Sequence, residues 1–217
     1  ATVETISEKA FQNAAITSVD MSQTEWTFSA ILKNAFENCE NLTSITIPLS
    51  VVTMQTDVFK GCDNLSINCE CAANQVSWNN NWNSSGRPVK WMCNAWDLED
   101  GVLTVKQDVN FSSSSNYPWY NQRNQVTSVV FTDNVTTVGR FGFYGYNYLV
   151  DVTIPASVET IGEQAFYNCY AMANLDLSQA TSLTSIGYEA FYNCDQITQV
   201  TIPASVTTVG YRIFNYC

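Results

Sequence analysis

The motif A-F-x-N-C recurs along this 217-residue chain and constrains its fold more than any other feature. Near-copies begin at Ala35, Ala165 and Ala190. Looser copies are centred on Phe11, Phe59, Phe143 and Phe214. The phenylalanines lie 25 and 23 residues apart in the first group, and 23, 25 and 23 apart in the second. Such a period is typical of a solenoid, in which each repeat buries its apolar face only against its neighbours.

One complete repeat runs over 149–169, L-V-D-V-T-I-P-A-S-V-E-T-I-G-E-Q-A-F-Y-N-C. Val152 and Ile154 alternate with polar residues, which predicts a short half-buried strand. Pro155 ends this strand because proline has no N–H for a ladder. The same template fits 42–62 and 197–217.

The second half of the repeat predicts two further pieces of local structure. Residues 157–161 alternate again and predict another short strand. Residues 163–168 predict one helical turn with Ala165 and Phe166 facing inward. The residue before each repeat cysteine is expected to be Asn or Gly and to adopt the left-handed conformation that caps such a turn, because these two residue types adopt it most readily. The members of this column are Asn38, Gly61, Asn168, Asn193 and Asn215.

Two repeats depart from this template in the same way. L-D-L-S-Q at 175–179 and V-D-M-S-Q at 19–23 replace the V-T-I-P strand. Their agreement predicts a shared variant with a longer turn.

The pattern L-x-x-V-x-I-P-x-S-V-x-x-I-G-x-x-A-F-x-N-C resembles the BspA-like, or Treponema-type, leucine-rich repeat. The resemblance covers 1–65 and 126–217. It departs from the family at Leu32 and Gln55, which replace Gly, and at Ala14 and Tyr146, which replace Cys. The resemblance implies a right-handed leucine-rich-repeat solenoid of short parallel β-strands and short helical or 3-10 turns. It also implies export to the cell surface and a role in adhesion or protein binding.

The repeat is lost between 66 and 125, which predicts four segments. Residues 1–65 form a first array, 66–95 its cap and linker, 96–125 the N-terminal cap of a second array, and 126–217 that second array. Solenoid ends need caps because they expose core and strand edges.

Three details support the predicted caps. The stretch W-N-S-S-G-R-P-V-K-W, at 82–91, resembles a recurrent end unit of the family. Residues 98–105 predict a hairpin with a tight Asp-Gly turn. Residues 118–120 are expected to plug the end of the second core.

Charge and hydropathy exclude several classes of partner. The 9 basic and 20 acidic side chains give a net charge of −11, which disfavours nucleic acid and anionic membranes. No apolar stretch reaches the roughly 20 residues of a membrane-spanning helix. The chain starts and ends inside a repeat and carries no signal peptide, so we expect it to be part of a longer protein. Abundant Ser, Thr and Asn with few Lys favour an extracellular location.

The eight cysteines form two groups. Five recur at one inward repeat position and should stack about 5 Å apart as buried thiols: Cys39, Cys62, Cys169, Cys194 and Cys217. The other three, Cys69, Cys71 and Cys93, lie off the repeat, where a bridge from Cys93 to Cys69 or Cys71 and free thiols are both open. A metal site is disfavoured because the chain has no histidine and the C-x-C spacing lacks a second pair.

Catalysis is not expected. The absence of histidine removes the usual general base at neutral pH. The sequence contains no phosphate loop, dinucleotide fingerprint or nucleophile elbow, and no spacing singles out a pair of catalytic carboxylates. No cofactor is indicated.

Three surfaces compete as binding sites, and the tyrosine column is the favoured one because like aromatic rings in one column give contiguous area. The sheet face should present Asp20, Ser44, Thr46, Asp151, Thr153, Asp176, Gln199 and Thr201. A column of tyrosines should present Tyr144, Tyr167 and Tyr192, with Tyr188 and Tyr211 nearby. The cap loop contributes Trp78, Trp82, Trp119 and Tyr120. Each set also has a purely structural interpretation: a solvated sheet face, a self-stacking ladder over the core, and buried cap residues.

The sequence therefore predicts a non-catalytic, bacterial cell-surface module for adhesion or protein interaction. Its partner is expected to be an extracellular protein of a host matrix, host surface or neighbouring cell. Two alternatives stay open: a passive surface spacer, and a glycan-binding module that uses the tyrosine column.

Overall fold

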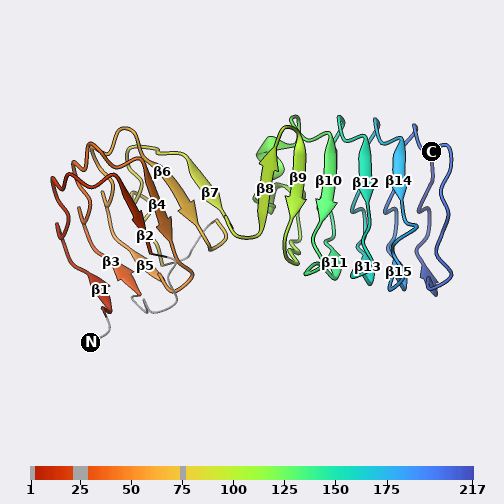
Figure 1. The fold of residues 1–217 in the computed structure, drawn as a ribbon, viewed down its shortest axis with the longest axis horizontal. Helices are drawn as coiled ribbons and strands as arrows, with labels where there is room; N and C mark the ends of the chain where they lie inside the picture. The colour runs from red at the N-terminus through yellow and green to blue at the C-terminus, as the bar shows by residue number, and fades with distance from the viewer. Residues whose placement is uncertain (1–2, 22–28, 74–76) are drawn as a thin grey trace. The chain divides into compact units, whose positions relative to one another are not determined.

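The structure, a computed structural model, describes residues 3–21, 29–73 and 77–217. The chain divides into two compact units, Ala1–Cys93 and Asn94–Cys217. Within each unit, successive coils add short parallel strands to two sheets (Figure 1). The predicted solenoid of short parallel strands is confirmed. The finer division into arrays and caps stays a prediction.

The first unit, Ala1–Cys93, contains two parallel sheets. One has the order β2-β4-β6-β7 and the other the order β1-β3-β5. Their strands are β1 (Thr5–Ile6), β2 (Ser18–Asp20), β3 (Ala30–Ile31), β4 (Ser44–Ile47), β5 (Thr53–Met54), β6 (Ser66–Cys69) and β7 (Val89–Trp91). The variant predicted at 19–23 can be followed only to Met21, because Ser22 and Gln23 lie outside the described residues.

The second unit, Asn94–Cys217, repeats this plan with the orders β14-β12-β10-β9-β8 and β11-β13-β15-β16. Its elements are β8 (Trp96–Glu99), β9 (Val102–Val105), η1 (Ser114–Asn116), η2 (Tyr120–Gln122), β10 (Ser128–Phe131), β11 (Thr137–Val138), β12 (Asp151–Thr153), β13 (Thr160–Ile161), β14 (Asn174–Asp176), β15 (Ser185–Ile186) and β16 (Thr208–Val209). Strands β8 and β9 form the predicted hairpin. Asp100 and Gly101 have φ values of 48° and 83° at its turn, as a tight primed turn requires.

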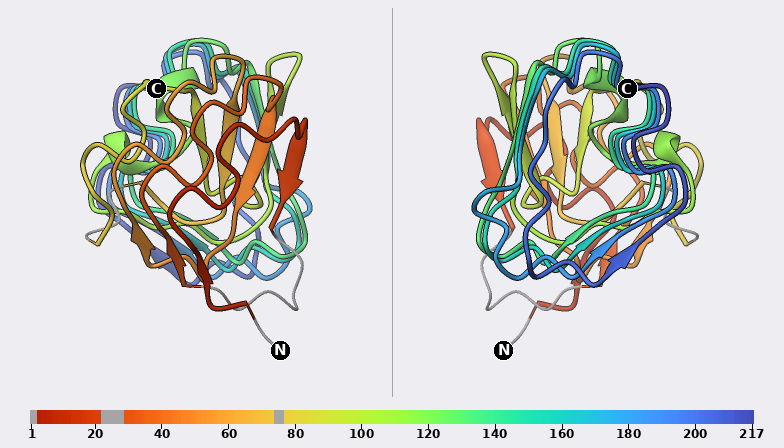
Figure 2. Two further views of the ribbon diagram at one scale, coloured as in Figure 1. Left: turned by 90° about the vertical axis from the view of Figure 1, so that its left-hand side faces the viewer. Right: turned by 90° about the vertical axis from the view of Figure 1, so that its right-hand side faces the viewer.

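The repeated phenylalanines form continuous columns through the cores. Phe166 is fully buried and stacks on Phe143 and Phe191, with ring centroids 5.0 and 5.3 Å away. In the first unit, Phe36 stacks on Phe11 and Phe59 at 4.9 and 5.6 Å. Viewed along the stacking direction, the coils of the second unit nearly superimpose (Figure 2). The inward register predicted for Phe166 and Phe191 is therefore confirmed.

The segment 163–168 forms hydrogen-bonded turns, so the predicted helical turn is wrong. The amides of Gln164, Phe166 and Asn168 donate to carbonyls of the next coil, at 2.9, 2.8 and 2.9 Å. The intervening amides of Ala165 and Tyr167 donate three residues back along the chain. Alternate amides thus point toward the neighbouring coil, and this leaves no continuous set of intrahelical bonds.

The predicted left-handed column is confirmed at Asn38, Gly61, Asn168 and Asn193, where φ lies between 58° and 76°. It is wrong at Asn215, because Tyr216 precedes Cys217 and carries the positive φ of 60°. A second left-handed column was not foreseen. Its members, for example Gln164 and Glu189 at φ 51°, share no residue type that favours this conformation.

In the second unit, a glycine follows the second strand of a repeat because neighbouring coils approach closely there. A Cβ atom built on Gly187 would lie 2.5 Å from the backbone nitrogen of Glu163. Gly162 and Gly210 meet the preceding coil in the same way.

Two predicted strands are shorter than expected or missing. Only Thr160–Ile161 of 157–161 pairs as a strand. In the last repeat, 198–202 forms no strand, so Gln199 and Thr201 do not extend the larger sheet. Strand β16 of the same coil still pairs with β15. The last coil therefore extends the smaller sheet but not the larger one.

Candidate functional site

The outward face of the larger sheet in the second unit carries two rows of side chains in register, and we call it the sheet face. Pairing along the five strands places the members of each row opposite one another. One row is Glu99, Val102, Ser128, Asp151 and Asn174, and the other is Asp97, Thr104, Val130, Thr153 and Asp176. The alternate residues, such as Val129 and Val152, are buried in the core. Neighbouring strands lie about 4.8 Å apart, so each row presents side chains at a regular spacing.

The charged members of the sheet face are acidic. Asp97, Glu99, Asp151 and Asp176 belong to its rows, and neither row contains Lys or Arg. Lys106 forms an ion pair with Asp97 at the hairpin end. Asn174 Nδ2 donates to Asp151 Oδ1 at 2.6 Å. The backbone amide of Ser178 donates to Asp176 Oδ1 at 2.8 Å and lowers the pKa of Asp176, which keeps that carboxylate ionised at neutral pH.

A groove of about 400 Å³ separates β14 from residues 198–201. Its lining includes Asn174, Asp176, Ser178, Gln199 and Thr201. Asn174 and Asp176 direct their main-chain bonds toward β12, so the N–H and C=O groups of Leu175 point to the groove side. Three residues of the predicted sheet-face set meet here or beside it, namely Asp176, Gln199 and Thr201.

The tyrosine column is a tight, half-buried ladder. Tyr167 stacks on Tyr144 and Tyr192 at centroid distances of 4.9 and 4.6 Å, with ring planes within 1° and 3° of parallel. Phe141 and Tyr216 meet the two ends of the ladder edge-on. Burial, followed by the neighbouring tyrosines, raises the pKa of Tyr167. The inner ring faces are therefore occupied by other rings, and the column offers mainly ring edges and hydroxyl groups to solvent.

Tyr188 and Tyr211 form a second, more open pair. Their ring centroids lie 6.4 Å apart, and the residues are 39% and 67% exposed. The Arg212 guanidinium lies 4.9 Å from the centroid of the Tyr211 ring and 3.8 Å from the Glu189 carboxylate. One side of Tyr211 is thus covered by a cation.

The corresponding face of the first unit is smaller. Asp20 is exposed on β2, while Ser44 and Thr46 are half-buried on β4. The predicted residues of this unit therefore lie on one sheet, separate from those of the second unit.

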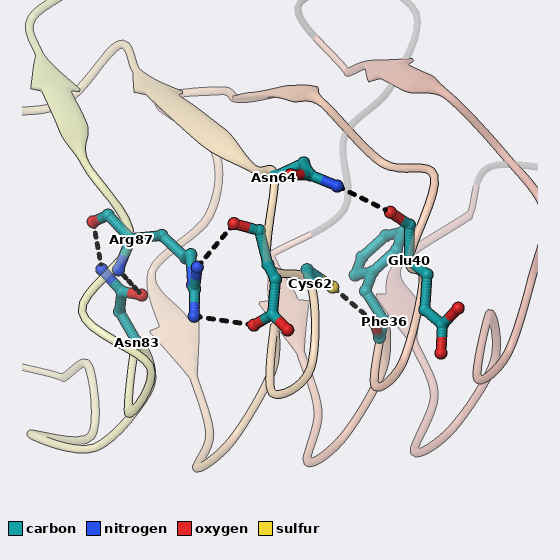
Figure 3. A network of polar contacts seen from close by, with 7 residues as sticks. Phe36, Glu40, Cys62, Asn64, Asn83 and Arg87 are labelled. Atoms are coloured by element: carbon teal, nitrogen blue, oxygen red, sulfur yellow. Dashed lines mark hydrogen bonds and ion pairs between the residues drawn. The ribbon is translucent and has the colours of Figure 1, made fainter.

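The end of the first unit is held by polar contacts (Figure 3) and by the packing of tryptophan rings. Arg87 donates to the Asp63 carbonyl at 2.7 Å and pairs with its carboxylate at 2.9 Å. Asn83 closes the intervening loop through two bonds with the Arg87 backbone. Trp78 and Trp82 pack edge-on at 5.2 Å, and Trp78 is buried. These contacts give the W-N-S-S-G-R-P segment a structural explanation.

The tryptophan predicted to plug the second core is also buried. Trp119 stacks on Phe143 at 6.0 Å, and its indole N–H donates to the Gly142 carbonyl at 3.1 Å. Tyr120, the remaining member of the cap-loop set, is half-buried and packs beneath the Arg123 guanidinium at 4.3 Å.

The repeat cysteines act as buried hydrogen-bond donors. Each Sγ donates to the carbonyl of a phenylalanine in the preceding coil, as in Cys62 to Phe36 at 3.0 Å and Cys194 to Phe166 at 3.1 Å. Burial raises the pKa of Cys62 to about 11, so it stays protonated at neutral pH. Cys217 keeps this bond at 3.1 Å but is exposed, so the prediction that all five are buried is wrong at this position.

Sequence reasoning missed part of the sheet face. The hairpin and β10 continue the same sheet and add Asp97, Glu99, Val102, Thr104, Ser128 and Val130. Asn174 joins it because β14 begins one residue before the predicted 175–179 segment. The sequence shows the alternation of apolar and polar residues at 98–105. It does not show how these residues align with those of β10.

The described residues contain neither a metal-binding cluster nor a membrane-spanning helix. Within 3–21, 29–73 and 77–217, no group of three or more Cys, Asp or Glu side chains is arranged to hold a metal ion. In the same part of the chain, no helix has the length and hydrophobicity required to span a bilayer.

Comparison with known families gives one extensive match. The family described as BspA type leucine rich repeat region matches residues 1–84 and 112–217, in 6 copies. No curated protein matches the chain.

Several solved structures are similar to the chain. A leucine-rich repeat protein of T. pallidum has 19% identity over 88% of this chain and 72% of its own, with a TM-score of 0.33. One from Eubacterium ventriosum has 14% identity over 94% and 83%, with a TM-score of 0.45. A leucine rich cell surface protein from Faecalibacterium prausnitzii has 18% identity over 97% and 77%, with a TM-score of 0.34.

Proposed function

The chain belongs to the BspA-type leucine-rich repeat family, and on that premise we propose that it is a non-catalytic protein-interaction module of the cell surface. We place its binding site on the sheet face of the second unit, at the groove beside β14. The partner is an extracellular protein, and the module serves adhesion or recognition. A sheet face built from several coils suits such a role, because it offers extended surface without an enclosed pocket.

The observation that carries this proposal is the register of the two polar rows. Because the strands pair without offset, polar side chains line up across the five strands, with carboxylate or amide groups on β8, β12 and β14 and hydroxyl groups on β9 and β10. Exposed Val102 and Val130 add apolar area between them. Such a mixture of apolar contact and directional polar groups is typical of protein interfaces.

The charge of the sheet face indicates the chemistry of its partner. Its rows contain four acidic side chains and no basic one, and acidic residues outnumber basic ones throughout the second unit. Complementary potentials favour association and exclude like-charged partners. The partner should therefore present Lys or Arg side chains to β12 and β14.

Glycan binding through the tyrosine column is the less favoured alternative. Sugars pack against aromatic faces, whereas the faces of Tyr167 are covered by Tyr144 and Tyr192. A passive spacer would need neither the acidic rows nor the groove, so binding experiments can separate it from the proposed module.

Reversing the charge of the sheet face should weaken binding. The double variant Asp151→Lys/Asp176→Lys should weaken binding at least tenfold, corresponding to about 1.4 kcal/mol, because it places like charges opposite a basic partner. Binding is measured by surface plasmon resonance against purified extracellular-matrix proteins and bacterial surface proteins, beside a glycan array. Circular dichroism should be unchanged, since both side chains are exposed.

Two variants serve as matched controls. Asp133→Lys makes one such charge reversal at an exposed turn outside the two rows, so it is compared with each single sheet-face variant and should leave binding intact. Tyr144→Phe/Tyr167→Phe/Tyr192→Phe keeps the stacked rings but removes their hydroxyl groups. Loss of binding in this triple variant alone would move the site to the tyrosine column. Binding to the glycan array without binding to any protein would favour a carbohydrate-binding module. No binding in either assay would favour the spacer.

A further inference from the structure

The end of the first unit brings two thiols opposite one another. Strands β6 and β7 are parallel neighbours, with Cys69 paired to Trp91. Beyond these paired residues, Cys71 lies in a bend and Cys93 lies in a turn that begins at Met92, where φ is 49°. The Met92 amide donates to the Cys71 carbonyl at 3.0 Å, and the Cys93 amide donates to the Cys69 carbonyl at 2.9 Å. The two backbones therefore stay adjacent beyond the paired residues.

This separation suits a disulfide. Neighbouring strands lie about 4.8 Å apart, within the range of about 4.4–6.8 Å between the Cα atoms of bridged cysteines. Cys69 and Cys71 lie two residues apart on one strand, a distance of about 6.6 Å at the upper end of that range. Cys69 is fully buried, whereas Cys71 keeps 6% of its surface exposed, so Cys71 is the more accessible partner for Cys93.

Solvent exposure also distinguishes Cys71 and Cys93 from the repeat cysteines. Cys93 is only half-buried, so it is the more accessible residue of the pair. Cys39 and Cys62 are fully buried, and each donates its thiol to a phenylalanine carbonyl. They are a matched pair of neighbouring thiols that solvent cannot reach.

We propose that Cys71 and Cys93 form a disulfide-exchange site that joins the last two strand segments of the first unit. Its co-substrate is a low-molecular-weight disulfide, RSSR. The Cys93 thiolate attacks one sulfur of RSSR, which gives a mixed disulfide and releases RS⁻. The Cys71 thiolate then attacks the Cys93 sulfur, which forms the protein disulfide and releases the second RS⁻. The two protons lost by the protein thiols are taken up by the two thiolates, so RSSR is reduced to two RSH.

The thiol neighbours favour Cys71 for the second step. A hydrogen bond with the Cys69 thiol lowers the pKa of Cys71, and the same bond raises the pKa of Cys69. Burial raises the pKa of Cys93, so its attack on RSSR should be the slower step. The site does not depend on the proposed binding function, although an extracellular location would supply the oxidising conditions that preserve the bridge.

The test uses the full folded chain and oxidised glutathione. After incubation at pH 8, free thiols are blocked with iodoacetamide and the protein is digested without reduction for tandem mass spectrometry. The chain has eight thiols, and oxidation should remove two of them. We expect one linked peptide pair that contains Cys71 and Cys93, and a higher melting temperature for the oxidised protein.

Two variants make the test specific. Cys71→Ser should stop at a mixed disulfide on Cys93, whereas Cys69→Ser should still form the bridge. A mixed disulfide on Cys93 that persists in the unaltered chain would overturn the proposal. So would a Cys69–Cys93 or Cys39–Cys62 link, or retention of all eight thiols. The unaltered chain alone decides the outcome if a variant fails to fold.

Discussion

Replacing Phe166 with alanine should lower the free energy of unfolding of the second unit by about 3–5 kcal/mol. The side chain is fully buried and stacks on Phe143 and Phe191, so its removal leaves a cavity that two coils share. Solenoid stability depends on the interfaces between neighbouring coils, and this substitution weakens two of them at once.

Urea unfolding followed by circular dichroism measures this effect. Tyr170→Ala is the matched control, because that aromatic side chain follows Phe166 by four residues but is 40% exposed. It should change stability by less than about 1 kcal/mol. Equal effects of the two substitutions would contradict the inward register of the phenylalanine column.

Replacing Trp119 with alanine should destabilise the second unit by a similar amount, about 3–5 kcal/mol. Trp119 lies at the end of the phenylalanine column, stacked on Phe143. Its indole donates to the Gly142 carbonyl at 3.1 Å, and its own carbonyl accepts from the buried Tyr146 hydroxyl at 3.2 Å. The substitution removes both the ring that covers the column and a hydrogen bond to a buried carbonyl.

A second substitution separates these two contributions. Trp119→Phe keeps an aromatic ring over Phe143 but loses the N–H donor, so it should recover most of the lost stability and remain about 1 kcal/mol below the original chain. Thermal unfolding of both variants, with exposed Tyr148→Ala as the control, makes the comparison. A Trp119→Ala protein as stable as the control would show that the core does not end on this ring.

The repeat architecture could be predicted because each position of the motif has one physical requirement. Phe166 and Phe191 must face inward, Pro155 must end a strand, and Asn168 accepts a left-handed conformation. These requirements are local, so they are visible in the residue types. The conformation of 163–168 was harder to predict, because it depends on amides that bond to the next coil. Local sequence could not distinguish that arrangement from a helical turn.

The candidate site was predicted only in part for the same reason. Asp151, Asp176 and Gln199 were identified as outward positions, but the groove between β14 and 198–201 depends on a strand that fails to pair. The tyrosine column was also identified, yet its tight stacking is set by the distance between coils. Pairing and spacing between coils are not encoded in the pattern of a single repeat.

Hydrogen–deuterium exchange with the tightest binder from the protein panel tests the central claim most directly. If the sheet face is the interaction surface, the partner should slow exchange at Leu175 and at 198–201, beside the groove. Exchange at Tyr144, Tyr167 and Tyr192 should be unchanged. Protection that appears around the tyrosines, with none at Leu175 or 198–201, would contradict the assignment of the sheet face as the binding site.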